Sequence, residues 1–329
     1  MPATTLDNQL LKLLEQGRAL GVPDFADLPP AAAREVYRML VTTHDAPAID
    51  LPVEDRAIPG PGGELALRIY RPPGDVVPRG AVLYLHGGGF VVGCPNDYDG
   101  LARSLCAQSG CVLVLPDYRL APEHLFPAAV EDAWAALAWL AANADEIGCV
   151  DADGQARIAV AGDSAGANLA AVCALLARDR GGPALCQQTL IYPVTVVDGA
   201  RFESRRTYGE GLTLSTRSMH YFTSHYLGSE DFLNSDHVRD FRAAPLEAAD
   251  LSGVAPALVL VAGFDPLRDE GVAYASALQT AGSDAVLIEY AGLAHGFINM
   301  SGTVEAARLA VAQVANAWRH ALAAPGTGQ

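Results

Sequence analysis

The chain has 329 residues, of which 50% are hydrophobic and 18% are charged, and its formal net charge is -16 at pH 7. A chain of this length can bury a full core, and this composition is that of a globular protein, which argues against disorder. Because the few Lys and Arg residues are scattered in an acidic chain, we expect no nucleic-acid partner and favour a small neutral substrate over an anionic one.

The N-terminal segment predicts a helix and not a targeting sequence. Its first 20 residues mix Asp7, Lys12, Glu15 and Arg18 with apolar residues, which is an amphipathic pattern without the apolar core of a signal peptide. Later segments do not approach the ~20 uninterrupted apolar residues of a membrane span. We therefore expect a cytoplasmic protein without stable membrane association.

The six cysteines form no CxxC pair and lie mostly in apolar runs, which indicates buried free thiols and no disulfides. They are Cys94, Cys106, Cys111, Cys149, Cys173 and Cys186. The chain also lacks H-E-x-x-H or comparable spacing of metal ligands, so we expect neither a metal nor another cofactor.

Short apolar runs alternate with longer helical segments from about Ala81 onward, which predicts a parallel sheet covered by helices on both faces. Before this region, Val53–Ile58 and Leu65–Arg71 flank a Pro- and Gly-rich turn and predict an antiparallel hairpin at one edge of the sheet. The other predicted strands are Ala81–Leu85, Cys111–Leu115, Arg157–Ala161, Thr189–Tyr192, Leu258–Ala262 and Val286–Tyr290. The predicted helices between and after them are Tyr98–Ser109, Ala128–Asn143, Gly166–Arg180, Arg268–Ala281 and Thr303–Leu322. The fold class is thus α/β, with a mostly parallel, eight-stranded central sheet flanked by helices.

Two segments do not follow this alternation, namely residues 1–50 and residues 195–245. We expect both to form a helical cap beyond the carboxyl ends of the strands, where open α/β sheets bind ligands. The alternative is a surface excursion without contact to the ligand. The remaining divisions are a core in two parts, 51–194 and 246–322, and a flexible tail at 323–329.

The strongest motif for a chemical function is Gly162-Asp163-Ser164-Ala165-Gly166, which follows the strand Arg157–Ala161 and opens a helix. This is G-x-S-x-G in the strand–turn–helix context of a nucleophile elbow, so we predict Ser164 as the nucleophile. The alternative is a tight turn whose serine only caps the helix. We interpret Asp163 as structural, because successive side chains at such a turn point apart.

A second glycine motif, His86-Gly87-Gly88-Gly89-Phe90, directly follows the strand Ala81–Leu85. In this context the loop supplies backbone N–H groups that stabilise the alkoxide formed when a hydroxyl attacks an ester carbonyl. We assign Gly88, Gly89 and Ala165 as these oxyanion-hole donors. For His86 we favour a role in ordering the loop over one in proton transfer.

A serine needs a base, and in this fold the usual chain order is serine, then acid, then histidine. Asp265 follows the strand Leu258–Ala262 after a predicted short loop, Gly263 and Phe264, and His295 follows the strand Val286–Tyr290 after a predicted loop, 291–294. We therefore predict Asp265 and His295 as the partners of Ser164. The rival candidates are Asp269, which reads as a helix-start carboxylate, and His320, which reads as a surface residue of a helix.

Together these residues resemble the hormone-sensitive-lipase-like family of bacterial esterases within the α/β-hydrolases. The resemblance extends from about Ala81 to Phe297. It rests on five motifs in order: His86-Gly-Gly-Gly-Phe90, Asp117-Tyr-Arg-Leu-Ala-Pro-Glu123 with Phe126-Pro-Ala128, Gly162-Asp-Ser-Ala-Gly-Ala-Asn168, Asp265-Pro-Leu-Arg-Asp-Glu-Gly271 and His295-Gly-Phe297.

The resemblance implies a carboxylic ester hydrolase with the triad Ser164, Asp265 and His295, an N-terminal helical cap, no metal, and a preference for short to medium acyl chains. It also implies that the protein can form a homodimer, because members of the family often do. Two alternatives stay open: an amidase or deacetylase acting on N-acyl or O-acetyl compounds, and a non-catalytic binding protein on the same scaffold. The binding proteins that resemble this family have lost the histidine, which this chain retains at His295.

Overall fold

The computed structural model describes residues 5–74 and 77–323 and contains one eight-stranded sheet in the order β1-β2-β4-β3-β5-β6-β7-β8. The strands are β1 (Val53–Gly60), β2 (Gly63–Tyr70), β3 (Ala81–Leu85), β4 (Val112–Pro116), β5 (Ile158–Asp163), β6 (Gln187–Ile191), β7 (Ala257–Phe264) and β8 (Ala285–Ala294). Strands β3 to β8 pair in parallel, whereas β1 and β2 pair with each other, and β2 with β4, in antiparallel. The predicted fold class is confirmed.

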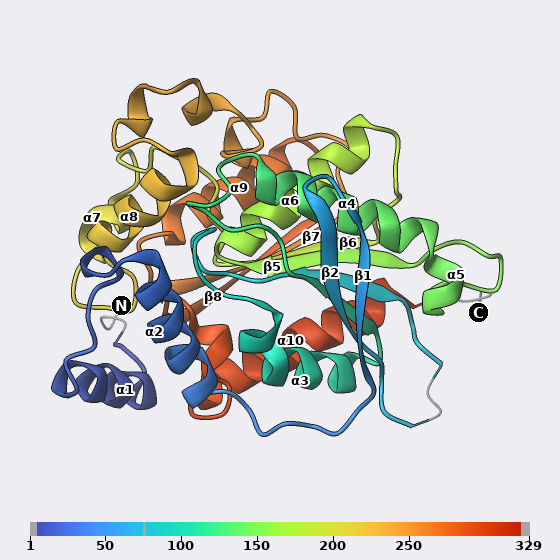
Figure 1. The fold of residues 1–329 in the computed structure, drawn as a ribbon, viewed down its shortest axis with the longest axis horizontal. Helices are drawn as coiled ribbons and strands as arrows, with labels where there is room; N and C mark the ends of the chain where they lie inside the picture. Colours follow the sequence, from blue (N-terminus) through green and yellow to red (C-terminus); the bar gives the residue numbers. More distant parts are fainter. Residues whose placement is uncertain (1–4, 75–76, 324–329) are drawn as a thin grey trace.

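The central strands are buried on both faces because helices cover each side of the sheet (Figure 1). Every residue of β3, β4 and β5 is buried, which explains why these strands read as continuous apolar runs. The flanking helices are α3 (Asp99–Ser109) and α10 (Glu305–Ala321) on one face, and α4 (Ala128–Ala142), α6 (Ala165–Asp179) and α9 (Arg268–Thr280) on the other. A short helix, α5 (Ala144–Ile147), follows α4.

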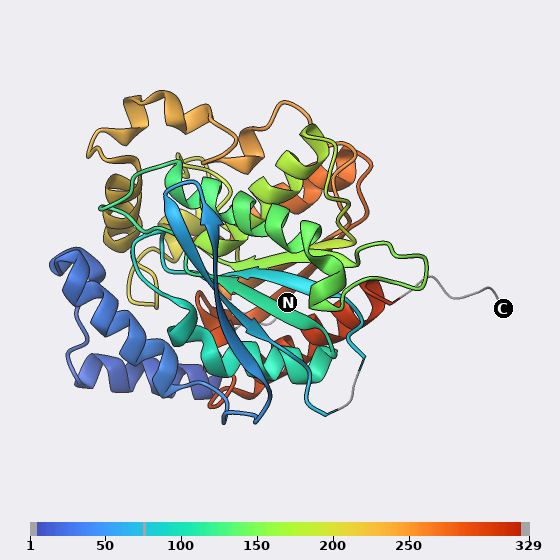
Figure 2. The same ribbon diagram turned by 45° about the vertical axis from the view of Figure 1, so that its right-hand side comes forward.

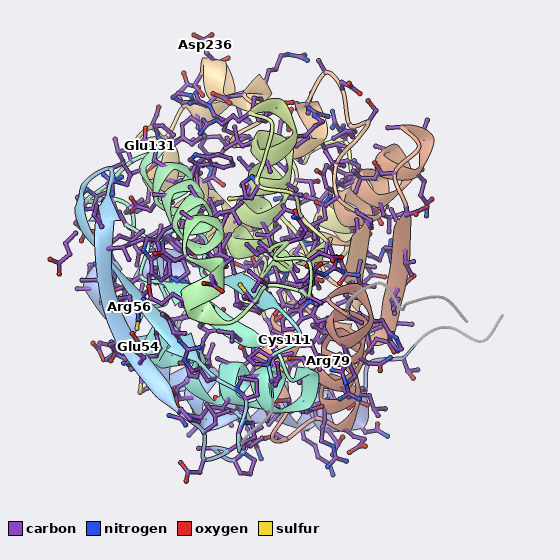
Figure 3. The ribbon with its side chains drawn as sticks, turned by 90° about the vertical axis from the view of Figure 1, so that its right-hand side faces the viewer. Glu54, Arg56, Arg79, Cys111, Glu131 and Asp236 are labelled. Carbon is purple, nitrogen blue, oxygen red and sulfur yellow. The ribbon has the colours of Figure 1, made fainter. Side chains whose placement is uncertain are left out.

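The two edges of the sheet differ in composition. The predicted hairpin forms one edge through β1, where Arg56 contacts Glu54 at 2.7 Å and Glu146 at 2.6 Å (Figure 3). Strand β8 lies at the opposite edge, and it exposes the side chains of Val286 and Leu287. Charged side chains on an edge strand oppose its pairing with another chain, and Arg56 and Glu54 lie on the β1 edge.

Two of the predicted loops are strand in the structure, which corrects the sequence analysis. Gly263 and Phe264 belong to β7, and residues 291–294 belong to β8, so both strands run almost to the predicted site residues. The ladder continues past a register shift, where Phe264 pairs with Ala294. A side chain at Gly263 would meet the carbonyl oxygen of Ala291 at 2.2 Å, so this glycine permits the close approach of the two backbones.

The two segments outside the alternation lie together at one end of the molecule (Figures 1 and 2). The N-terminal segment forms α1 (Asn8–Ala19), η1 (Phe25–Asp27) and α2 (Pro30–Thr43), and the later one contains α7 (Glu203–Thr207) and α8 (Thr216–Leu227). They are joined by Asp24, which accepts hydrogen bonds from the Ser215 and Ser218 hydroxyls, and by the ring contact of Phe25 with Phe222 at 5.3 Å. Except for Ala323, the predicted tail at 323–329 lies outside the described residues.

Candidate active site

Ser164 occupies a strained turn between β5 and α6. Its backbone dihedrals are φ 54° and ψ -117°, which a residue with a side chain rarely adopts. The turn is possible because the flanking glycine lets the helix approach β3: a side chain at Gly166 would meet the Leu85 carbonyl oxygen at 1.9 Å. The Ser164 N–H donates to the Ile191 carbonyl at 2.8 Å, which fixes the turn against β6. The hydroxyl therefore stands at the N-terminus of α6, where the helix dipole favours negative charge.

Two later strand ends bring an imidazole and a carboxylate to this hydroxyl. His295 Nε2 lies 2.9 Å from Ser164 Oγ, and His295 Nδ1 lies 2.8 Å from Asp265 Oδ2. Asp265 is fully buried, and its other oxygen accepts the Leu267 N–H at 2.8 Å, so the carboxylate is held in one orientation. The structure thus brings Ser164, His295 and Asp265 into one chain of hydrogen bonds.

The rival residues lie elsewhere. Asp269 accepts the Ser204 N–H at 2.8 Å and pairs with Arg268, and His320 is exposed near the end of α10. His86 is fully buried, stacks on Tyr118 with ring centroids 4.2 Å apart, and its Nδ1 lies 2.7 Å from the Gly87 carbonyl oxygen. Burial lowers the pKa of His86 to about 4, so its ring is neutral at pH 7. This placement agrees with a role in ordering the loop.

The glycine loop after β3 lines the same cavity as Ser164. Gly88 and Gly89 have φ angles of 118° and 59°, and a side chain at Gly88 would meet the Val92 carbonyl oxygen at 2.1 Å. Only glycine fits such a position without displacing the backbone. Ala165, the third predicted donor, is the first residue of α6, where helix geometry leaves the N–H without a partner in its own helix.

A cavity of about 440 Å³ opens onto these residues, within the range of small-molecule sites. Its walls come from segments far apart in sequence, because α1, α2 and α8 enclose it together with the two glycine-containing turns. Apolar lining residues include Leu10, Leu13, Leu14, Val41, Val194, Val196, Leu214, Phe222 and Leu267. These residues carry no sequence signal that would place them in the site, because helical periodicity alone does not tell which face of α1 or α8 borders a ligand.

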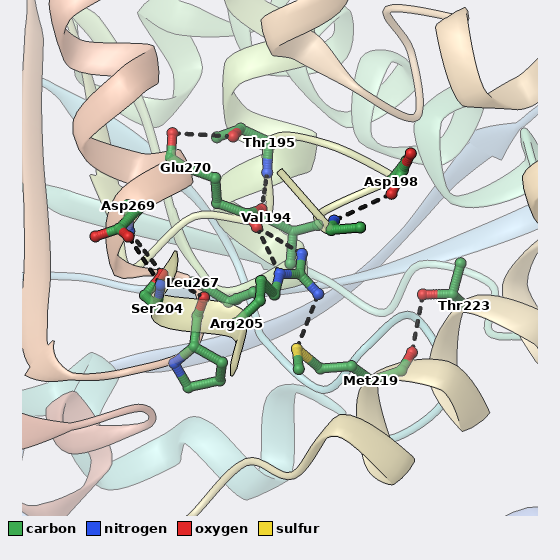
Figure 4. Close-up of polar contacts among 12 residues, drawn as sticks. Val194, Thr195, Asp198, Ser204, Arg205, Met219, Thr223, Leu267, Asp269 and Glu270 are labelled. Atoms are coloured by element: carbon green, nitrogen blue, oxygen red, sulfur yellow. Dashed lines mark hydrogen bonds and ion pairs between the residues drawn. The ribbon is translucent and has the colours of Figure 1, made fainter. Parts of the chain in front are cut away.

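One wall of this cavity rests on a buried ion pair between α7 and α9 (Figure 4). Arg205 donates through Nε and Nη2 to Glu270 Oε2 at 2.8 and 2.5 Å, and Glu270 Oε1 accepts the Thr195 N–H at 2.9 Å. Burial raises the pKa of Glu270, and the Arg205 guanidinium and the Thr195 N–H oppose this shift. The pair connects the segment 195–245 to the helix that follows Asp265.

Within residues 5–74 and 77–323, no three or more His, Cys, Asp or Glu side chains are grouped so that they could hold a metal ion. No helix among the described residues has the length and apolar composition needed to cross a bilayer. All six cysteines are free, and four of them are buried.

Known proteins share both the sequence and the fold of this chain. The α/β hydrolase fold family matches residues 82–299. The carboxylic ester hydrolase LipN of Mycobacterium tuberculosis is 44% identical over 303 residues, which cover 90% of this chain and 78% of that protein. The ethyl acetate hydrolase of Pseudomonas putida is 40% identical over 75% of each chain. A hyperthermophilic esterase from Pyrobaculum calidifontis superposes with a TM-score of 0.87 at 42% identity, covering 97% of this chain and 100% of that structure. The chain therefore belongs to the α/β hydrolase fold family, among its hormone-sensitive-lipase-like esterases.

Proposed function

We propose that the protein hydrolyses esters of short to medium acyl chains through an acyl-enzyme formed on Ser164. The protein is a carboxylesterase of the serine hydrolase class, as its relatives indicate. The observation that carries the mechanism is the hydrogen-bonded chain from Ser164 through His295 to Asp265, with distances of 2.9 and 2.8 Å.

In the first step, His295 Nε2 takes the proton of Ser164 as Oγ attacks the ester carbonyl. The same imidazole then protonates the leaving alcohol, and water repeats the sequence on the acyl-enzyme. Asp265 accepts a hydrogen bond from the Nδ1–H of the ring, which selects the tautomer whose Nε2 can act as a base and stabilises the imidazolium. Because Asp265 is fully buried, its interaction with the imidazolium is little screened by water.

The negative charge that develops on the carbonyl oxygen requires fixed donors. We assign the backbone N–H groups of Gly88, Gly89 and Ala165 to this oxyanion hole. Two of these residues line the cavity beside Ser164, and the third follows Ser164 in the chain. Losing one such donor lowers kcat by about 10²–10³ in enzymes of this type.

The cavity supports the choice of substrate. Its size and its many aliphatic lining residues suit a neutral ester with a short to medium acyl chain. Because α1, α2 and α8 supply much of the wall, we assign residues 1–50 and 195–245 to a cap that sets the acyl-length limit. A profile of kcat/KM against acyl length tests this: truncating Leu14 or Phe222 to Ala should shift the optimum towards longer chains.

The test of the mechanism is the variant Ser164→Ala. It should abolish hydrolysis of p-nitrophenyl acetate and labelling by a fluorophosphonate while the unfolding midpoint stays close to that of the wild type. Turnover near the wild-type rate would refute the assignment of the nucleophile. Rates on matched ester and amide pairs would reveal an amidase, which the ester-hydrolysing relatives do not favour.

We also propose that the protein forms a homodimer through β8. This strand is the edge of the sheet and exposes Val286 and Leu287, so a second copy can add its own β8 and cover both side chains. Light scattering should give a dimer for the wild type and a monomer for Val286→Lys. A wild-type monomer at micromolar concentration would remove this proposal.

A further inference from the structure

A second acidic side chain lies beside the nucleophile, and the mechanism proposed above does not use it. Asp163 is the last residue of β5 and directly precedes Ser164. Only 2% of its surface is exposed, so its carboxylate has exchanged nearly all of its water for contacts within the protein. A buried carboxylate is costly unless several donors satisfy it, so its partners indicate why it is there.

Four neutral donors surround this carboxylate, and they come from four different segments. Oδ1 accepts the Gly87 N–H at 2.9 Å and the Tyr84 hydroxyl at 3.1 Å. Oδ2 accepts the Tyr98 hydroxyl at 3.0 Å and the Tyr192 hydroxyl at 3.3 Å. The donors belong to the glycine loop, to β3, to η2 (Pro95–Tyr98) and to the residue that follows β6.

The contact with the glycine loop is especially close. The Gly87 N–H is shared between Asp163 Oδ1 and the Tyr98 hydroxyl oxygen, each at 2.9 Å. A side chain at Gly87 would lie 2.4 Å from Asp163 Oδ2, so the loop backbone rests directly on the carboxylate. The next two residues in the chain are Gly88 and Gly89.

The other donors reach the remaining parts of the site. Tyr192 has a positive φ of 38°, and its ring centroid lies 4.6 Å from that of His295. The Tyr98 hydroxyl also contacts the Tyr37 hydroxyl of α2 at 2.6 Å and Asn299 Nδ2, beyond His295 in the chain, at 3.4 Å. One carboxylate therefore connects the nucleophile turn, the glycine loop, the histidine loop and α2.

We propose that Asp163 is a positioning residue, which holds the oxyanion loop against the nucleophile turn through the Gly87 N–H. This inference rests on the proposed function, because it assigns Gly88 and Gly89 as donors to the oxyanion. Preorganised donors stabilise a developing charge only when they are already in place.

The central experiment compares Asp163→Ala with Asp163→Asn. Both variants remove the negative charge, but only Asn keeps an oxygen that can accept the Gly87 N–H and the Tyr84 hydroxyl. Its amide NH2 would face Tyr98 and Tyr192, whose hydroxyls can also accept. With p-nitrophenyl butyrate, we expect Asp163→Ala to lower kcat by about 10² with KM changed less than about threefold. We expect Asp163→Asn to recover most of this loss.

A matched pair of tyrosine variants avoids the risk that Asp163→Ala does not fold. Tyr84 and Tyr98 are both buried and both donate to Asp163, but only the Tyr98 oxygen also accepts the Gly87 N–H. Tyr98→Phe should therefore lower kcat by about tenfold, and Tyr84→Phe should leave it within about threefold of the wild type. Urea unfolding of each variant shows that the folded protein is being assayed.

The readout that separates positioning from mere structural support is the affinity for a trifluoromethyl ketone, which forms a tetrahedral oxyanion adduct on the serine. Its Ki should rise by the same factor by which kcat falls, because the oxyanion donors act on the adduct and on the transition state alike. The proposal is overturned if Ki stays constant, if Asn at position 163 is as poor as Ala, or if Tyr84→Phe and Tyr98→Phe lose activity equally. Failure of the proposed function itself would appear separately, as turnover by Ser164→Ala.

Discussion

The buried carboxylate at Asp163 gives a quantitative prediction about stability. Burial raises its pKa from the ordinary value of 3.8 to about 6, while hydrogen bonds from Tyr98, Tyr84 and Gly87 oppose this rise. In the unfolded chain the carboxyl is solvated and ionises near its ordinary value. The folded state therefore binds this proton more tightly than the unfolded state does. The resulting stabilisation is complete below about pH 4 and is lost as the pH rises through about 6.

The magnitude follows from the two pKa values. At 1.36 kcal/mol for each pKa unit, the difference corresponds to about 3 kcal/mol between low pH and pH 8. Roughly half of this change falls between pH 5 and pH 8. Asn cannot ionise, so the free energy of unfolding of Asp163→Asn should rise relative to the wild type by about 1.5 kcal/mol over that range.

Urea unfolding at several pH values between 5 and 8 measures this difference. Asp45, whose pKa burial also raises to about 6, is present in both proteins, so its contribution cancels. The exposed residue Asp145 provides a matched control, Asp145→Asn, for the loss of one acidic group. A difference between wild type and Asp163→Asn that does not change with pH would refute the reasoning. The expected pattern is unusual, because Asp163→Asn should become more stable relative to the wild type as the pH rises towards 8, although the substitution should lower activity.

Two further predictions concern the acid and the ion pair. Asp265→Asn should lower kcat by about 10⁴ without unfolding the protein, because the amide favours the wrong tautomer of His295. Stopped-flow ester hydrolysis measures kcat, and a decrease of less than about tenfold would remove Asp265 from the mechanism. Arg205→Met should cost about 3–5 kcal/mol in urea unfolding, since it leaves the fully buried Glu270 unpaired. The control Arg206→Met breaks the exposed pair with Glu203 and should cost less than about 1 kcal/mol, so equal costs would contradict this account.

Local sequence patterns determined much of the fold. The apolar runs that predict β3 and β5 do form strands, and every residue of these strands is buried. A strand that helices cover on both faces must be apolar throughout, so its sequence identifies it. Strand ends were less predictable. Residues 291–294 read as a loop, yet they extend β8. They can pair with β7 because Gly263 lets the two backbones approach closely, and the sequence of β8 alone does not show this contact.

The active site likewise contains residues that the sequence indicated and residues that only the structure placed there. The sequence alone indicated Ser164, Asp265 and His295, because a strained turn requires glycines at fixed spacing and the chain order of the three residues is characteristic. Only the tertiary structure decided that Asp163 holds the glycine loop, and that α1, α2 and α8 enclose the cavity. Short-range patterns report the backbone that a segment must adopt, whereas a contact such as that of Asp163 with Gly87, 76 residues apart in the sequence, depends on how the whole chain packs.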